Sequence, residues 1–452
     1  MRTVLYFVGR KGLKVTPVQK ISRPDSPKKF APPINERFCL PMELSEATVE
    51  QITSKARTEF CAKHQSFADF CFVHHKTEPL IPATKLTSYD AISEVFEVPI
   101  LVLGGVNNIA MSHTLQSLLK QPGLNTKKVY VAYSIMFGDD YKPFIELFGF
   151  QQVVVKPISR YVEFLTAALQ QFWLLNSDAT HAIVIDDEVV AKPGFMWYMG
   201  HALKAMKRDS QIGAASAWNP QGFETVASDP SAVHVVSLFP GQAFLISKTF
   251  YEVEIKDREQ ECCSQRSIQQ WFQSGTQKQY KYIIPEISRA GYFSPTAYSA
   301  QTQPLSSLAM SMPRTAASMN LTEVPLLMDN VYNFDTVVTD NLKSAYYVTE
   351  RDMTICRNSK GKGAVKLLAP FLPLDKHNIA VVYSQARADD YQSLKYLYSC
   401  FGLMYMDGIS PYGIYNGVTT VSLGNKRVYL VGTSSAYYKQ TAQSLNPYVA
   451  SF

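Results

Sequence analysis

Three adjacent carboxylates, Asp186, Asp187 and Glu188, directly follow a short apolar segment. That segment, residues 182–185, is too short for a helix and rich in β-branched side chains, which predicts a strand buried on both faces of a parallel sheet. Open α/β sheets bind ligands at the carboxyl ends of their strands, and a cluster of oxygen donors suits Mg²⁺ or Mn²⁺ that carries a diphosphate. The sequence therefore predicts a ligand site at these acids, although acids after a strand are often only a solvated turn.

Composition and charge exclude several classes of protein. The chain has 452 residues, 46% of them hydrophobic and 18% charged, which is enough to bury a sizeable core in more than one domain. The net charge is +6, and basic residues are scattered except around residues 357–366, so we expect no nucleic-acid binding. No apolar run reaches the roughly 18 residues that span a bilayer. The motifs of the α/β-hydrolases and of the P-loop and protein kinases do not occur.

Seven cysteines occur without the spacing of a zinc site. Cys61 and Cys71 bracket a short loop that a disulfide would close, which favours an oxidising compartment. Ordinary buried thiols are the alternative.

Strands and helices alternate from about residue 98, which predicts a doubly wound α/β sheet. We expect strands at residues 98–103, 129–133, 153–155, 182–185, 212–218, 243–246 and 280–284. We expect the first helix to be capped by Ser112, and further helices at residues 141–148, 159–175, 195–206 and 267–272.

Differences in composition and in hydrophobic pattern along the chain predict four parts. Residues 1–96 form an irregular, proline-rich leader with one helix at 44–61, and residues 97–303 form the α/β domain. Residues 304–375 connect it to residues 376–452, a small βαββ module with strands at 379–383, 417–423 and 428–431 and a helix at 389–401.

Three further motifs follow the acids: Ser-Ala-Trp-Asn at 216–219, Phe-Pro-Gly at 239–241 and Pro-Glu-Ile-Ser-Arg at 285–289. Their order and separations resemble glycosyltransferase family 13, from residue 98 to the C-terminus, most specifically over residues 214–230. The resemblance implies a GT-A type nucleotide-sugar-binding domain with a mixed, mostly parallel sheet and a C-terminal βαββ module. It also implies inverting transfer of N-acetylglucosamine (GlcNAc), with Mn²⁺, from UDP-GlcNAc to a mannose-terminated glycoprotein acceptor through a β-1,2 linkage.

That family acts in the Golgi lumen and normally carries an N-terminal membrane anchor, which this sequence does not show. The resemblance also assigns roles to residues. Glu188 would hold the metal, in a position where the family uses aspartate, while Asp186 and Asp187 would face the ribose and the sugar. We expect the acids to face a cleft that Trp218 and Phe239 also line. The full set of substrate-binding residues implied by the resemblance is Asp186, Asp187, Trp218, Asn219, Gly241, Ser288 and Arg289.

The position of the catalytic base departs from the family. An inverting transfer needs a group that takes the proton of the acceptor hydroxyl. The family supplies an aspartate two residues before a tryptophan that corresponds to Trp271, yet Gln269 stands there, and an amide cannot act as a base. Glu259 or Glu261 is the alternative source of a base.

The residues expected near the nucleotide also differ from those of the family. The turn Gly104-Gly105 lacks the family's arginine, and Ser134 stands where the family has an aspartate. Two hypotheses therefore remain open. The chain is a GlcNAc transferase, or it is a catalytically dead family member that serves as a glycan-binding or scaffold protein.

Overall fold

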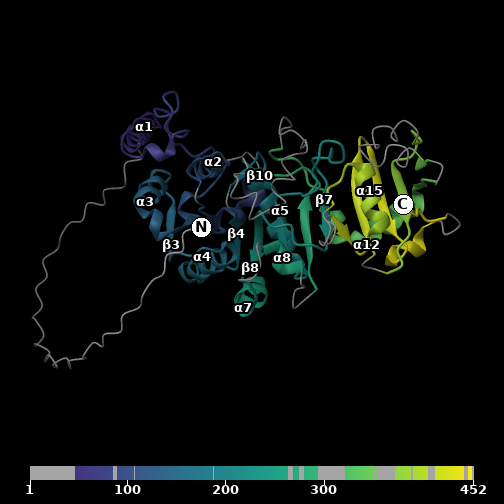
Figure 1. The fold of residues 1–452 in the computed structure, drawn as a ribbon. Coiled ribbons are helices and arrows are strands. Elements are labelled where there is room, and N and C mark those ends of the chain that lie inside the picture. The colour runs from purple at the N-terminus through teal and green to yellow at the C-terminus, as the bar shows by residue number, and fades with distance from the viewer. Residues whose placement is uncertain are drawn as a thin grey trace, which may run out of the picture. The chain divides into compact units, whose positions relative to one another are not determined.

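The structure, a computed structural model, describes residues 46–84, 89–105, 107–186, 188–262, 268–273, 279–293, 321–349, 352–354, 372–387, 390–405, 413–441 and 446–449. Residues 46–452 form one compact unit (Figure 1). Within the described ranges, every helix is too short or too polar to cross a bilayer.

An eight-stranded sheet forms the centre of this unit, in the order β3-β2-β1-β4-β8-β6-β9-β7. The first four strands run parallel, β8 and β7 run antiparallel to their neighbours, and β6 pairs with β9 in parallel. The strands are β1 (Ile100–Leu103), β2 (Val129–Ser134), β3 (Gln151–Val155), β4 (His181–Ile185), β6 (Ile212–Ser216), β7 (Val233–Val236), β8 (Ala243–Ser247) and β9 (Lys281–Pro285). A two-stranded ribbon of β5 (Val189–Ala191) and β10 (Ala290–Tyr292) adjoins it.

Helices cover both faces of the sheet because successive strand residues point to opposite sides. Ile183 and Ile185 belong to one core with α2, α3 and α5, whereas Ala182 and Val184 belong to a second core with α4 and α8. This alternation produces three layers. The helices, with a short π-helical and several 3₁₀ turns, are α2 (Asn108–Leu119), η3 (Thr126–Lys128), η4 (Ile135–Phe137), α3 (Gly138–Leu147), α4 (Tyr161–Leu175), α5 (Phe195–Arg208), α6 (Lys248–Phe250), η5 (Tyr251–Ile255), η6 (Lys256–Arg258), α7 (Glu259–Cys262) and α8 (Ile268–Gln273).

The start of α2 differs from the prediction. Asn107, not Ser112, is the N-cap, and its side-chain oxygen accepts hydrogen bonds from the backbone N–H groups of Ile109 and Ala110. Ser112 lies inside the helix, fully buried, and its Oγ donates to the carbonyl of Ile109. Both residue types are good caps, so the local sequence alone does not distinguish them.

The second sheet has five strands in the order β11-β12-β15-β14-β13. Helix α15 packs on one face and α12 on the other, and both are drawn beside this sheet in Figure 1. Just before α15, the carboxylate of Asp390 accepts hydrogen bonds from the backbone N–H groups of Gln392 and Ala386. The elements are α11 (Asp329–Tyr332), α12 (Phe334–Ser344), β11 (Tyr346–Tyr347), β12 (Asn378–Tyr383), α15 (Gln392–Phe401), β13 (Ile414–Tyr415), β14 (Val418–Leu423), β15 (Lys426–Gly432) and η8 (Ala436–Gln440).

The predicted fold class is confirmed. The chain is α/β, with a mixed sheet whose β1–β4 half is entirely parallel, as expected for a GT-A nucleotide-sugar domain. Helix α12 falls within the predicted connecting segment, and its Val338 and Leu342 are buried against the second sheet.

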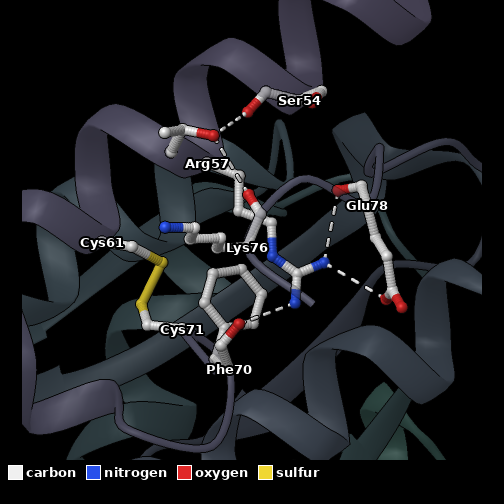
Figure 2. The surroundings of a disulfide bond; sticks show 8 residues. Ser54, Arg57, Cys61, Phe70, Cys71, Lys76 and Glu78 are labelled. Atoms are coloured by element: carbon white, nitrogen blue, oxygen red, sulfur yellow. Dashed lines mark hydrogen bonds and ion pairs between the residues drawn. A yellow bond between two sulfur atoms is a disulfide. The ribbon is translucent and has the colours of Figure 1, made fainter. Parts of the chain in front are cut away.

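A disulfide fixes the segment that precedes the sheet. Helix α1 (Glu46–Lys63) is followed by two 3₁₀ segments, η1 (Gln65–Phe67) and η2 (Tyr89–Glu97). Cys61 and Cys71 are bonded, as predicted, and Cys400 is also disulfide-bonded. Figure 2 shows Arg57 beside this bridge, where one guanidinium nitrogen donates to the carbonyl of Phe70 at 2.8 Å. The guanidinium carbon also lies 4.0 Å from the centre of the Phe70 ring.

We expect the double variant Cys61→Ser/Cys71→Ser to lose about 2–3 kcal/mol of unfolding free energy, because the bridge closes a loop with a sequence separation of 10. Urea denaturation followed by circular dichroism measures this loss. Reduction of the wild type under mild conditions should destabilise it at least as much, and an unchanged urea midpoint in the double variant would contradict the prediction.

Candidate functional site

Asp186 lies immediately after β4, which is flanked by β1 and β8 in the middle of the sheet. It is 2% exposed, and its backbone N–H donates to the carbonyl of Gln242 at 2.7 Å. Its carboxylate accepts a hydrogen bond from the hydroxyl of Tyr161, at the start of α4. The first of the three acids therefore lies at the carboxyl edge of the sheet. Tyr161 of helix α4 holds its carboxylate there. Asp187 lies outside the described residues.

Glu188 occupies a turn between β4 and β5. Its φ of 61° is in the left-handed region, which is uncommon for a residue other than glycine and typical of functional sites. The side chain is 2% exposed, and Oε1 accepts a hydrogen bond from Nδ2 of Asn107 at 3.1 Å. Asn107 therefore caps α2 and orients Glu188 at the same time, a role that the sequence analysis missed.

A cavity of about 80 Å³ opens beside Tyr161, where β1 and β2 end. Gly104, Gly105 and Ser134 form its wall on the strand side, and Arg160 and Tyr161 form the wall on the side of α4. Tyr161 thus joins this cavity to the carboxylate of Asp186. Arg160 brings a cation to a pocket whose first turn lacks the arginine expected from the resemblance.

The glycine at the end of β1 has a packing reason. A Cβ on Gly104 would lie 2.5 Å from the carbonyl oxygen of Ala132 in β2 and 2.7 Å from the Met111 side chain. Only glycine permits this close approach. Gly104 is therefore required by the packing between β1, β2 and α2.

The turns after β6 and β9 hold each other in place through two predicted substrate-binding residues. The backbone N–H of Asn219 donates to Oγ of Ser288 at 2.9 Å, and its side chain donates to the carbonyl of Glu286 at 2.8 Å. Two residues further, the Gln221 amide exchanges two hydrogen bonds of 2.8 Å with the backbone of Met404. The most specific stretch of the resemblance therefore has a structural role in joining the two sheets.

Trp218 and Phe239, which the sequence analysis expected to line a cleft, are both buried. Trp218 is 2% exposed and lies edge-on to Tyr292, with ring centroids 6.1 Å apart. Phe239 is 1% exposed and packs against Phe244 at 5.0 Å. Each ring is part of a hydrophobic core cluster, which is the commoner use of a large aromatic side chain.

Gly241 and Arg289 also lie inside the protein. Gly241 has a φ of 71°, and its carbonyl accepts a hydrogen bond from Ser216 Oγ at 2.8 Å. Arg289 is 0% exposed and donates to the carbonyl of Pro230 at 2.7 Å. Burial lowers the pKa of its guanidinium to about 10. Their roles toward a substrate stay predictions.

Glu286, in the same motif as Arg289, is the centre of a buried polar cluster. Its side chain is 1% exposed and lies in the turn after β9. The groups around its carboxylate are the backbone N–H groups of Ser228 and Asp229, both at 2.8 Å, His234 Nε2 at 3.1 Å, Ser422 Oγ at 2.9 Å and an Arg427 guanidinium nitrogen at 2.5 Å. Because Ser422 and Arg427 belong to β14 and β15, this cluster also ties the central sheet to the second sheet.

Gln269 lies in α8, one turn of helix whose Ile268 and Trp271 are buried. Of the two alternative bases, Glu261 accepts hydrogen bonds from Arg258 at 2.7 and 3.0 Å. These hydrogen bonds lower the pKa of Glu261, which makes it a poorer base. Glu259 is exposed at the start of α7.

Mn²⁺, the metal implied by the resemblance, prefers oxygen ligands. Among the described residues, no three His, Cys, Asp or Glu side chains gather closely enough to hold an ion by themselves. A cation that carries a diphosphate needs only one or two protein carboxylates, because phosphate oxygens and water complete its coordination. Glu188, a hard carboxylate fixed by Asn107, fits that arrangement.

Similar solved structures share little sequence with this chain. They include mannose-1-phosphate geranyltransferase from Thermus thermophilus, at 8% identity and a TM-score of 0.27, covering 74% of this chain and 94% of that one. A structure of GalNAc-T7 with UDP, GalNAc and Mn²⁺ is 14% identical with a TM-score of 0.28, covering 43% of each chain. Likenesses this weak carry no argument about activity.

The sequence profile of the GNT-I family matches residues 128–443, which is more than half of the chain and includes the acids, the turn motifs and all strands of the second sheet. This match agrees with the resemblance to glycosyltransferase family 13. The chain belongs to the GNT-I family of glycosyltransferases.

Proposed function

We propose that this chain is an inverting N-acetylglucosaminyltransferase that moves GlcNAc from UDP-GlcNAc to a mannose of a protein-linked glycan, forming a β-1,2 linkage. The observation that supports it best is the cavity at the ends of β1 and β2, which Tyr161 connects to Asp186 in a GNT-I family chain. The acceptor that we propose is an O-linked mannose, and the mannose of an N-glycan is the alternative.

Each residue of the site has a separate proposed role, which follows from its position. Gly105 and Ser134 would border the nucleotide, and Arg160 would place a positive charge near its diphosphate. Glu188 would hold Mn²⁺, which when bound neutralises diphosphate charge and assists UDP departure. The disulfides agree with the Golgi lumen as the place of action.

Transfer by inversion breaks the bond between the anomeric carbon and the diphosphate, and UDP leaves with the electron pair. The acceptor hydroxyl forms the new bond from the opposite side, and its proton must pass to a base. Gln269 can orient that hydroxyl by hydrogen bonding but cannot take its proton. Gln269 also favours a second candidate function, a catalytically dead GNT-I family protein that binds glycans or serves as a scaffold.

Changing Gln269 to aspartate tests the proposal. If the donor site works and only the base is missing, Gln269→Asp should raise the rate of UDP release with a mannoside acceptor by on the order of 10²-fold over wild type. Gln270→Asp, on the same helix turn, is the matched control and should have no effect. Coupled detection of UDP and linkage analysis of the product provide the measurement. If the wild type is inactive and Gln269→Asp is no faster than Gln270→Asp, the result favours the catalytically dead family member.

A further inference from the structure

A second cavity, of about 580 Å³, lies between the disulfide-linked segment and helix α2. This volume is in the range of about 300–1,000 Å³ that is usual for small-ligand sites. Figure 2 shows two residues that line it, Arg57 and Glu78, with the Phe70 ring between the Arg57 guanidinium and the Cys61–Cys71 bridge. The bridge therefore fixes one wall of the cavity covalently.

The fixed charges around this cavity cancel. Arg57 and Lys120 carry positive charges, and Asp69 and Glu78 carry negative ones. Each acid already has a partner, since Asp69 lies 2.5 Å from His113 Nε2 and Glu78 lies 3.7 Å from the Arg57 guanidinium. A strongly charged ligand gains little from such a balanced lining, whereas a neutral ligand rich in hydrogen-bonding groups suits it.

Two buried polar atoms of lining residues have no hydrogen-bond partner among the described residues. They are Arg57 Nε, a donor, and Gln121 Oε1, an acceptor, on side chains of residues that are 1% and 4% exposed. Buried polar atoms normally find partners in the protein, in water or in a ligand. Both atoms are closed off from a water-sized probe, so the hydrogen-bonding groups that a polyhydroxylated ligand can reach are those of lining side chains such as Gln116 and Lys120.

Aromatic rings and aliphatic side chains form another part of the lining. The ring of His113 stacks on Phe293 at a centroid distance of 3.8 Å, and Val190 and Ala191 of β5 adjoin them. A pyranose presents a C–H face to such a wall and hydroxyl groups around its edge. The backbone N–H of Phe293 also donates to the carbonyl of Glu188 at 2.9 Å, so this wall is one hydrogen bond away from the acidic turn.

We infer that this cavity binds a neutral saccharide unit of the acceptor, distinct from the mannose that receives GlcNAc; the inference rests on the proposed function. A peptide strand is a poorer occupant because the ribbon that borders the cavity has no open edge to offer there. Strand β5 pairs with β10, and the N–H of Ala191 donates to Ser117 Oγ at 2.9 Å.

Saturation-transfer NMR with a mannose-ended trisaccharide, in the absence of UDP-GlcNAc, tests the inference directly. We expect the wild type to bind it, and Gln116→Ala and Lys120→Ala each to weaken binding about five- to tenfold, since each removes a lining group able to hydrogen-bond a hydroxyl. Lys127→Ala, an exposed lysine outside the cavity on η3, should bind like wild type.

Transfer kinetics separate this site from the donor site. Gln116→Ala and Lys120→Ala should raise KM for the trisaccharide and leave KM for methyl α-mannopyranoside unchanged, because a single sugar fills only the reacting position. If the wild type binds the trisaccharide but transfers no GlcNAc to it, the inference about the cavity stands and the proposed activity is wrong. Equal trisaccharide affinities in wild type and both variants would overturn the inference. So would an unglycosylated acceptor peptide that competes for the cavity with the same sensitivity to the variants.

Discussion

Glu188→Gln is expected to lower Mn²⁺-dependent binding of UDP-GlcNAc by on the order of 10²-fold or more, since it replaces the proposed metal ligand with a neutral amide of equal size. The amide oxygen can still accept the hydrogen bond from Asn107, so the fold should survive. Glutamine is a better test than alanine. Glu188 is only 2% exposed, and its removal would leave the Asn107 amide unsatisfied at a cost of about 1–3 kcal/mol.

The increase in melting temperature caused by UDP-GlcNAc, measured with and without Mn²⁺, is the readout for Glu188→Gln. Asp178→Asn is the matched control, because this exposed carboxylate precedes β4 at the opposite end of the strand. It should behave like wild type. A full Mn²⁺-dependent increase in Glu188→Gln would exclude Glu188 and point to Asp186 or Asp187.

Glu286→Gln is expected to lower the unfolding free energy by about 3–5 kcal/mol, because the buried carboxylate loses its charged hydrogen bond to Arg427, which keeps only Asp229 at 3.0 Å as a charge partner. The amide nitrogen would also face donors, since five groups surround this carboxylate. Urea denaturation gives the change in unfolding free energy. Glu94→Gln, which breaks an exposed pair of 2.7 Å with Lys207, should leave stability almost unchanged. Equal effects of the two substitutions would contradict the role of Glu286.

The same carboxylate predicts a pH dependence. Burial alone would raise the pKa of Glu286, but the hydrogen bond and charge of His234, with the charge of Arg427, outweigh it and lower the pKa to about 2. Because the ordinary value is 4.5, the unfolded chain binds this proton first as the pH falls. The resulting stability, roughly 3 kcal/mol, is fully present above about pH 4.5 and is lost between there and about pH 2. Glu286→Gln should lack this part of the acid dependence.

Local patterns predicted the central sheet because its strands are buried on both faces. The residues 182–185 are 0% exposed, so their uninterrupted apolar run is a direct consequence of their position in the sheet. The start of α2 could not be predicted in the same way. Asn107 and Ser112 are both suitable caps, and Asn107 is selected by the turn that also brings its amide to Glu188.

Contacts between distant segments explain why the site residues were harder to predict. Glu286 lies 141 residues from Arg427, so its motif gave no sign that it joins two sheets. Trp218 is buried with Tyr292, which comes much later in the chain. Arg160 could not be connected with the cavity until the ends of β1 and β2 were placed next to the start of α4.

The most direct measurement is a calorimetric titration of the wild-type chain with UDP-GlcNAc, in the presence of Mn²⁺ and again in the presence of EDTA. We predict saturable binding with Mn²⁺ and binding at least tenfold weaker with EDTA, since the diphosphate would lose its bridge to Glu188. A folded wild-type chain that binds no UDP-GlcNAc under either condition would contradict the proposed transferase.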